Sequence, residues 1–169
     1  MRQFSSNIQT AIDSQFRYFF LIDVAFNQYN ASTSQYEQNI KRFTSYYQDV
    51  KFNEGLSNEI TYTADGGLFE VDAPSFSSIV DREAYKIVIT DKNNEFLNIF
   101  KLNAIGAAIT VRIMVEDPST DTLLINNAND ISNQPDVVFV YSGFVDGPTV
   151  DNDFDQKIAV IEGTSPMAD

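Results

Sequence analysis

Hydrophobic and polar residues alternate with a period of two along much of the chain, which is the pattern of β-strands that bury one face. The longest alternating stretches are residues 16–26, 84–90, 107–115, 137–145 and 156–162. Shorter stretches with strand-forming composition occupy residues 42–51, 58–63 and 68–71. Turn-forming residues separate these segments, which is typical of antiparallel architectures. The pattern predicts a mainly β protein, an antiparallel β-barrel or sandwich, whose single β domain spans residues 16–163.

The segments at 16–26 and 27–40 differ sharply in composition. In the first, Phe19 and Leu21 lie on the face opposite Phe20 and Ile22, so a strand here is apolar on both sides and belongs inside the sheet. The second has no apolar period and is rich in amides and hydroxyls. It predicts a long polar excursion from the β domain.

One short helix is expected before the first strand, near residues 5–14. Ser6 and Gln9 have the spacing of a capping box, and four apolar residues recur at helical spacing: Phe4, Ile8, Ala11 and Ile12. A helix of this length is marginal alone, so its apolar side must pack on another surface. We expect it to pack on its own domain, with docking on a neighbouring subunit as the alternative. Residues 1–15 then form an N-terminal arm, and 164–169 an extended C-terminal tail.

Composition narrows the range of functions. The 169 residues include 24 acidic and 11 basic side chains, a net charge of −13, which opposes binding to nucleic acid or to anionic lipid. No cysteine or histidine is present, so the usual thiolate nucleophile, the usual base at neutral pH and the commonest metal ligands are missing. The apolar run at 16–26 is too short to span a bilayer. We therefore expect no enzyme, no cofactor, no nucleic-acid binding and no membrane insertion.

Two acidic clusters are candidate sites. Asp151, Asp153 and Asp155 with Glu162 match a calcium-loop spacing, but the sixth position lacks the required glycine, so a solvated hairpin tip is favoured over calcium binding. The Asp81–Glu83 cluster provides the carboxylates a glycosidase needs, yet nothing sets their pKa values apart. A surface charge cluster is expected there, with an intersubunit ion pair through Arg82 as the second reading.

A series of short motifs, each weak singly, extends the interpretation over residues 16–167. The motifs are FFLIDV at 19–24, RFT at 42–44, VKFNEG at 50–55, ITYT at 60–63, GGLFEV at 66–71, YKIVI at 85–89, residues 106–113, SGFVDG at 142–147 and IAVIEGTSPM at 158–167. Their order and spacing resemble the N-terminal β domain of tailed-phage tail-tip proteins of the lambda minor tail protein L type. That family also has a cysteine-bearing metallocluster region; this chain has no cysteine, so only the β-domain role is carried over.

The resemblance implies a virion structural protein, a hub or ring component that joins the tail tube to the distal tip. Its partners would be copies of itself in a ring and other tail proteins, and it would be made in the host cytoplasm and reside in the virion. The candidate interface residues are Phe4, Ile8, Tyr29, Tyr36, Arg82, Pro166 and Met167. A non-catalytic β-sandwich that binds host-surface glycans through loops such as 126–133 and 151–155 is the alternative, and a glycosidase ranks third.

Overall fold

The computed structural model describes residues 4–13, 18–64, 68–72, 84–90, 107–145 and 158–164. One α-helix, α1 (Ser6–Asp13), precedes the strands, and a short 3-10 helix, η2 (Ile131–Asn133), lies in the loop before β8. The strands are β1 (Tyr18–Asn30), β2 (Gln35–Thr44), β3 (Val50–Phe52), β4 (Ile60–Tyr62), β5 (Leu68–Asp72), β6 (Ala84–Thr90), β7 (Ala108–Val115), β8 (Val137–Val145) and β9 (Ile158–Thr164).

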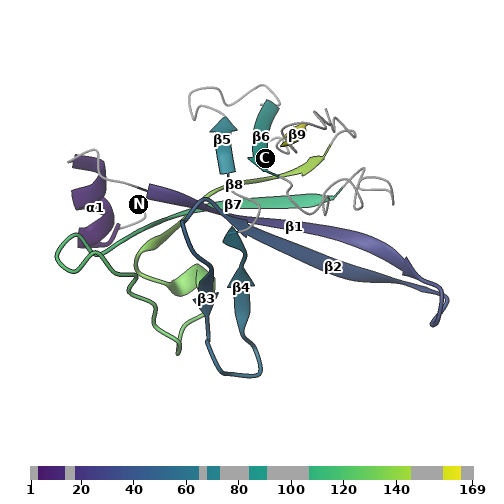
Figure 1. The fold of residues 1–169 in the computed structure, drawn as a ribbon, viewed down its shortest axis with the longest axis horizontal. Coiled ribbons are helices and arrows are strands. Elements are labelled where there is room, and N and C mark those ends of the chain that lie inside the picture. Colours follow the sequence, from purple (N-terminus) through teal and green to yellow (C-terminus); the bar gives the residue numbers. More distant parts are fainter. Residues whose placement is uncertain are drawn as a thin grey trace.

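Seven of these strands form one antiparallel sheet in the order β2-β1-β7-β8-β9-β6-β5, while β3 and β4 form a separate hairpin. Within the described residues β8 and β9 pair at two positions, Phe144–Thr164 and Val145–Gly163, so this junction is the weakest in the sheet. Figure 1 shows β5, β6 and β9 drawn to one side of β1, β7 and β8. The predicted mainly β, antiparallel fold with one helix near the N-terminus is confirmed.

One face of the β1–β7 pair is covered by the β3–β4 hairpin. Phe19 and Leu21 of β1 pack there against Phe52 and Tyr62, and the same cluster includes Met114 of β7. Leu21 and Tyr62 have no exposed surface. Burial of these large side chains fixes the hairpin on the sheet, each contributing roughly 1.5–3 kcal/mol.

The opposite face of the same strands is also buried. Ile22 and Val24 of β1 lie beside Ile109 and Val111 of β7, and all four are at most 1% exposed. The sequence-based expectation of a strand with two apolar faces is therefore confirmed for β1, which is paired with β2 on one side and β7 on the other.

The polar excursion expected at residues 27–40 has regular secondary structure that its sequence pattern did not predict. It forms the distal half of a β-hairpin: β1 continues to Asn30, and β2 begins at Gln35 after a turn at 31–34. The hydrophobic alternation that identifies strands is absent because both faces of this hairpin lie in solvent. Backbone pairing holds the strands together without an apolar face.

The strand expected at 42–51 is interrupted. β2 ends at Thr44 and β3 starts at Val50, because the chain bends at 45–48 and the side chains at the bend bond back to β1. The Thr44 hydroxyl donates to the Phe20 carbonyl at 2.9 Å, and the Phe20 N–H donates to Ser45 Oγ at 2.8 Å. Polar side chains at a bend can compete with the ladder for backbone groups.

Two smaller predictions also shift. The helix is capped by Ser5 rather than Ser6: the Ile8 N–H donates to Ser5 Oγ at 3.2 Å, and the Gln9 N–H donates to the Ser5 carbonyl. The last strand runs from Ile158 to Thr164, two residues beyond the expected 156–162. By contrast, the strand at 84–90 has the expected bounds, and those at 107–115 and 137–145 agree to within one residue.

Candidate functional site

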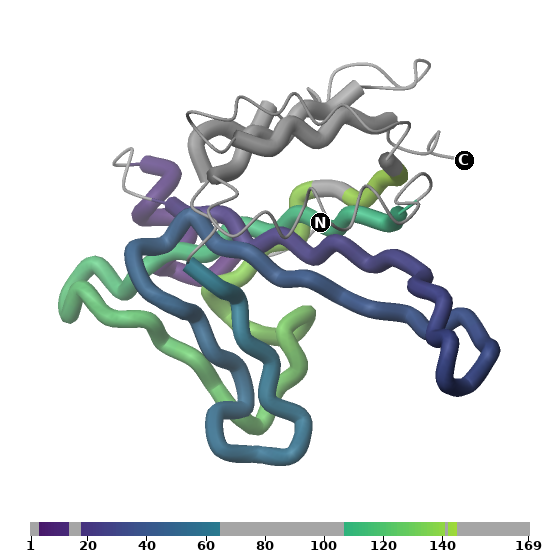
Figure 2. Tube along the Cα trace, turned by 45° about the vertical axis from the view of Figure 1, so that its right-hand side comes forward, coloured from purple at the N-terminus to yellow at the C-terminus, as the bar shows by residue number. Residues whose placement is uncertain are grey.

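The β1–β2 hairpin extends past the rest of the sheet as a two-stranded arm, defined here as residues 27–40. β1 and β2 pair without interruption from Leu21–Thr44 to Asn30–Gln35. Figure 2 shows this hairpin projecting away from the other described segments. Every residue from 35 to 40 is exposed, as are residues 27–29. The arm therefore has backbone order but almost no burial.

Side chains pair across the arm on its two faces. Tyr29 and Tyr36 stand opposite each other with ring centroids 5.4 Å apart in an edge-on arrangement, yet they remain 53% and 71% exposed. Asn39 Nδ2 donates to Gln28 Oε1 at 2.9 Å, and Asn30 Nδ2 donates to an oxygen of Glu37 at 3.0 Å. Cross-strand pairs of this kind keep the arm extended, and exposed tyrosines are favoured in contact surfaces.

The outer edge of the arm has no strand beside it among the described residues. β2 is the end strand of the sheet. Near its base, the Thr63 N–H donates to the Arg42 carbonyl and the Thr44 N–H donates to the Thr63 carbonyl, both at 3.1 Å. Backbone groups of every second residue in a strand point to the same side. The N–H and C=O groups of Tyr36, Gln38 and Ile40 therefore point away from β1, as those of Arg42 and Thr44 do. Such an edge can accept another strand.

An apolar strip crosses the sheet where the arm begins. Register places Ile40 of β2, Ala25 of β1, Ala108 of β7 and Phe144 of β8 side by side on one face. Ile40 and Phe144 are 39% and 50% exposed, and neither alanine is fully buried. Exposed apolar rows on a sheet face are unusual on a monomer, because solvation of their surface is unfavourable.

A cluster of charges lies beside this strip, at the base of the arm. Asp23 of β1 faces Arg42 of β2, with Arg42 Nε 3.5 Å from Asp23 Oδ2, and Arg112 of β7, with Arg112 Nη1 3.8 Å from Asp23 Oδ1. The hydroxyl of Tyr62 donates to the same carboxylate. Arg42 Nε and Arg112 Nη1 are buried without a hydrogen-bond partner. Two cations around one carboxylate leave the cluster positive in a strongly acidic protein.

Burial raises the pKa of Tyr62, and the negative charge of Asp23 raises it further, while the two arginines act in the opposite direction. The tyrosine therefore stays protonated and can keep donating to Asp23. Tyr46 is held in the same way: burial and a hydrogen bond to Glu116 raise its pKa. Both tyrosines act as structural donors in the neutral form.

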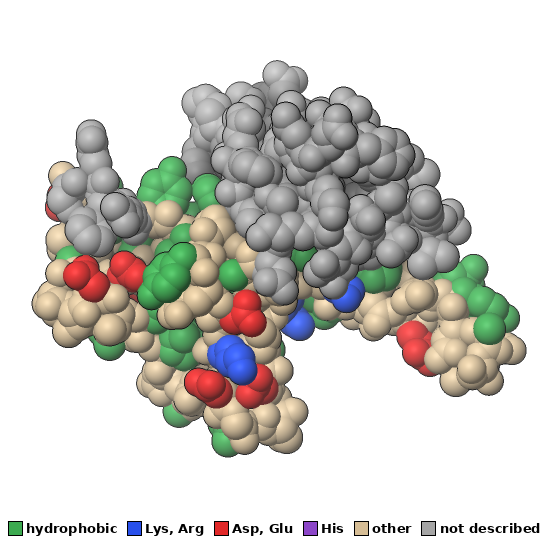
Figure 3. Space-filling model, viewed as in Figure 1, with side chains coloured by type: hydrophobic (Ala, Val, Ile, Leu, Met, Phe, Trp, Pro, Cys, Tyr) green, Lys and Arg blue, Asp and Glu red, His purple; other side chains and the backbone are tan. Residues whose placement is uncertain are grey.

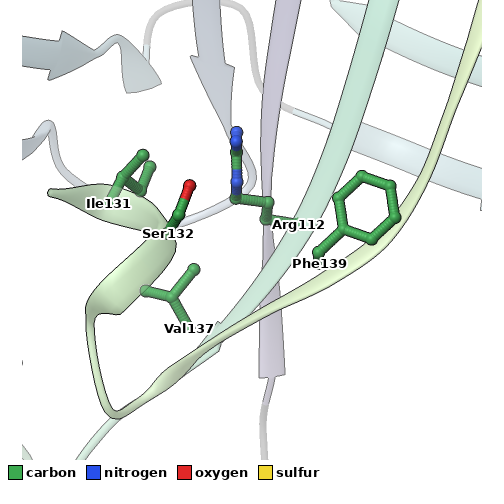
Figure 4. Close-up of a pocket in the computed structure, with 5 residues that line it drawn as sticks. All are labelled: Arg112, Ile131, Ser132, Val137 and Phe139. Carbon is green, nitrogen blue, oxygen red and sulfur yellow. The ribbon is translucent and has the colours of Figure 1, made fainter. Parts of the chain in front are cut away.

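A pocket of about 300 Å³ opens next to Arg112, lined by Arg112, Ile131, Ser132, Val137 and Phe139. Figure 4 shows the Arg112 guanidinium and the Ser132 hydroxyl close to each other, with the Phe139 ring on the far side of Arg112 and Val137 near η2. The Arg112 side chain is 15% exposed. The pocket thus combines a cation and a hydroxyl with apolar walls, which suits a small anionic group.

The carboxylates outside the arm mostly serve local structure. The Gly55 N–H donates to Glu59 at 2.8 Å and lowers the pKa of that carboxyl, which also lies 3.8 Å from Lys51. Hydrogen bonds from Ser119 lower the pKa of Asp117. In Figure 3 acidic side chains lie beside a basic one on the β3–β4 hairpin. Among the described residues, no group of three or more potential metal ligands comes together.

The interface residues predicted from the sequence differ in exposure, and some lie outside the described residues. Tyr29 and Tyr36 lie together on the arm, and Phe4 is 42% exposed before α1. Ile8, by contrast, is 2% exposed and packs with Ala11 and Val115 of its own chain, so its assignment to a contact surface was wrong. The remaining candidates lie outside the described residues: Arg82, Pro166, Met167, the Asp81–Glu83 cluster, and the calcium candidates Asp151, Asp153 and Asp155.

The charge cluster was missed by sequence reasoning. Asp23 interrupts the apolar run at 16–26, and Arg112 interrupts the apolar strand at 107–115. A charge inside an otherwise apolar strand signals a buried or half-buried pair. Its partners could not be assigned, because Asp23, Arg42 and Arg112 meet only through the β2-β1-β7 order and register.

Comparisons with known proteins leave the family open. No protein-family model matches the chain. No curated protein matches it either. No helix within the described part of the chain is long and apolar enough to cross a membrane.

Proposed function

We propose that the protein is a virion structural protein of a phage tail tip, a ring or hub component that binds copies of itself and neighbouring tail proteins through its arm. The proposal rests on the resemblance of the motif series to the lambda-type tail-tip domain and on a surface suited to assembly. In this role the arm acts as a connector, and the sheet from which it projects acts as its rigid base.

The observation that carries the proposal is the arm itself. An isolated two-stranded hairpin is at best marginally stable in water, and an exposed strand edge is a liability unless something covers it. Here the edge of β2 is accompanied by two exposed tyrosines and continues into the strip from Ile40 to Phe144. A free monomer gains nothing from these features, whereas a subunit in an assembly buries them.

The arm is polar enough to remain soluble before assembly. Its exposed surface consists largely of amides, hydroxyls and tyrosine rings, and Figure 3 shows mostly uncharged atoms over this projection. Interfaces built from tyrosine and polar side chains are hydrated and form from already folded partners. Such a surface suits subunits that fold alone and then join a ring.

The alternative of glycan binding at residues 126–133 is less favoured. Three amide side chains of this loop hold the protein itself: Asn126 Oδ1 accepts the Ala128 N–H, Asn127 Oδ1 accepts the Asn53 N–H, and Asn129 Nδ2 donates to the Asn133 carbonyl. Gln134 Nε2 donates to the carbonyls of Asn126 and Asn129. These bonds engage one atom of each of the three amide side chains, which leaves fewer donors and acceptors for a sugar.

Electron microscopy of the purified protein over a range of concentrations, together with antibody labelling of virions, tests the proposal. We expect closed rings or ring fragments at high concentration and label at the distal end of the tail. A protein that stays monomeric at millimolar concentration and is absent from virions would refute it. A glycan array serves as the control, and saturable sugar binding would favour the alternative.

A further inference from the structure

The pocket beside Arg112 and the tip of the β3–β4 hairpin have complementary chemistry on different parts of the chain. We propose that the pocket receives the Glu54 carboxylate from the β3–β4 tip of a second copy, with Leu56 packing on the apolar wall. The inference rests on the proposed function in that it specifies one contact between neighbouring subunits.

The positive partner is the Arg112 pocket. Asp23 is shared between Arg42 and Arg112 at distances of 3.5 and 3.8 Å, so a single carboxylate faces two guanidinium groups. The buried Nη1 of Arg112 has no hydrogen-bond partner, and the Arg112 side chain lines the pocket and is 15% exposed. A second carboxylate at the open end, near the exposed Ser132 hydroxyl, would balance the charge of the cluster.

The negative partner is a fixed protrusion. The tip of the β3–β4 hairpin is closed by hydrogen bonds from the Leu56 N–H to the Asn53 carbonyl at 3.0 Å and from the Glu59 N–H to the Leu56 carbonyl at 3.1 Å. Positive φ angles at Asn53 and Gly55 make the tight turn. Phe52 and Tyr62 anchor the hairpin in the core. The backbone of the tip is therefore already ordered before it binds, which lowers the entropy cost of the contact.

Within that tip, Glu54 is the carboxylate that remains unused. Glu59 already accepts the Gly55 N–H and lies near Lys51. The Glu54 carboxylate has no hydrogen bond or ion pair with any other described residue, and it is exposed. Leu56, two residues further on, is 52% exposed. An acid and an apolar side chain at one tip match a cation and apolar walls in one pocket.

The match requires two copies of the chain. Glu54 and Leu56 are not among the residues that line the pocket, and Figure 1 shows the β3–β4 tip pointing away from β7 and β8. A contact between two different surfaces of identical subunits can continue from copy to copy, and it closes into a ring when the rotation permits. With a net charge of −13 per copy, a local positive site gives this contact its direction.

Two exposed positions allow the contact to be tested without disturbing the fold. Glu54→Arg places a cation on the tip, and Ser132→Asp places a carboxylate at the mouth of the pocket. Sedimentation velocity should show the self-association constant of each variant weakened about tenfold or more, because like charges then face each other. Asp13→Arg, at the exposed last residue of α1, matches the charge change of Glu54→Arg and should associate as the wild type does.

Mixing the two variants gives the sharpest outcome. In a 1:1 mixture, the native tip of Ser132→Asp meets the native pocket of Glu54→Arg, so association should return to within a few fold of the wild type. Unchanged association of both single variants, or failure of the mixture to recover, would overturn this contact. If those variants associate normally but shortening of the arm abolishes assembly, the contact is wrong and the proposed function stands. If the wild type never associates, both are wrong.

Discussion

The two ends of the β1–β2 hairpin are made of the same pair of strands and have opposite environments. At the base, Leu21 and Thr44 pair with no exposed surface on either residue, beneath the β3–β4 hairpin. At the tip, Tyr29 and Tyr36 pair while each residue is more than half exposed. Continuous backbone pairing therefore says nothing about where stability resides. The base holds the fold together, and the arm is free to serve a contact.

The largest effect should come from the base. Leu21→Ala removes a fully buried side chain from the cluster around Phe52 and Tyr62 and leaves a cavity. We expect the free energy of unfolding to fall by about 3 kcal/mol, measured by urea denaturation followed by circular dichroism. A loss below about 1 kcal/mol would mean that the β3–β4 hairpin does not seal this face as described.

The charge cluster, at the junction of the two regions, should respond unequally to its members. Asp23→Asn leaves Arg42 and Arg112 without their carboxylate and should cost roughly 2 kcal/mol, since part of the cluster is still solvated. Arg112→Met leaves the Asp23–Arg42 pair neutral and should cost less than about 1 kcal/mol. The same denaturation experiment checks both variants. Equal losses would show that the two arginines do not share one acid.

Alkaline pH should destabilise the base of the hairpin through Tyr62. Because the pKa of Tyr62 is raised in the folded state, its stabilising effect is complete below the unfolded value of about 10 and is lost as the pH rises above it. Tyrosinate absorbance should show Tyr62 ionising only with unfolding. Early ionisation of Tyr62, identified with Tyr62→Phe, would contradict its burial.

The sequence predicts segments with a buried face better than it predicts the exposed arm. Strands at 84–90, 107–115 and 137–145 could be located because their sequences alternate, and in β7 the alternation includes the fully buried Ile109 and Val111 on one face. The arm was predicted as a polar excursion, but its paired strands were not, because neither face is buried and no alternation is imposed. Tyr29 and Tyr36 could still be identified as contact candidates, since large aromatic residues in a polar segment have no core to enter. The pairing of these two tyrosines across a hairpin could not be predicted from the sequence.

Contacts that depend on register were also beyond sequence reasoning. Asp23, Arg42 and Arg112 are separated by 19 and 70 residues along the chain, and only the β2-β1-β7 order brings them together. The prediction of Ile8 as an interface residue was wrong for a related reason. Its spacing gave the helix an apolar side, but only the fold decides that Val115 covers it. Periodicity identifies which side chains are apolar, and topology decides which of them are covered.

The smallest effect on stability should come from shortening the arm. Replacement of residues 28–37 by Asn-Gly keeps Asn27 opposite Gln38 and supplies a two-residue turn that suits an antiparallel hairpin. We expect the free energy of unfolding to change by less than about 1 kcal/mol, while assembly seen by sedimentation is lost. Loss of folding would show that the arm belongs to the stable core, and intact assembly would remove it from the interface.

Amide hydrogen exchange across residues 27–40 tests the central claim most directly, in dilute monomer and in assembled protein. If the arm is a contact surface, its amides exchange rapidly in the monomer, while those of residues 19–24 are protected. On assembly, protection should spread along the arm, first at the outward-facing N–H groups of Tyr36, Gln38 and Ile40. Exchange in the arm that is identical in both states would contradict the account.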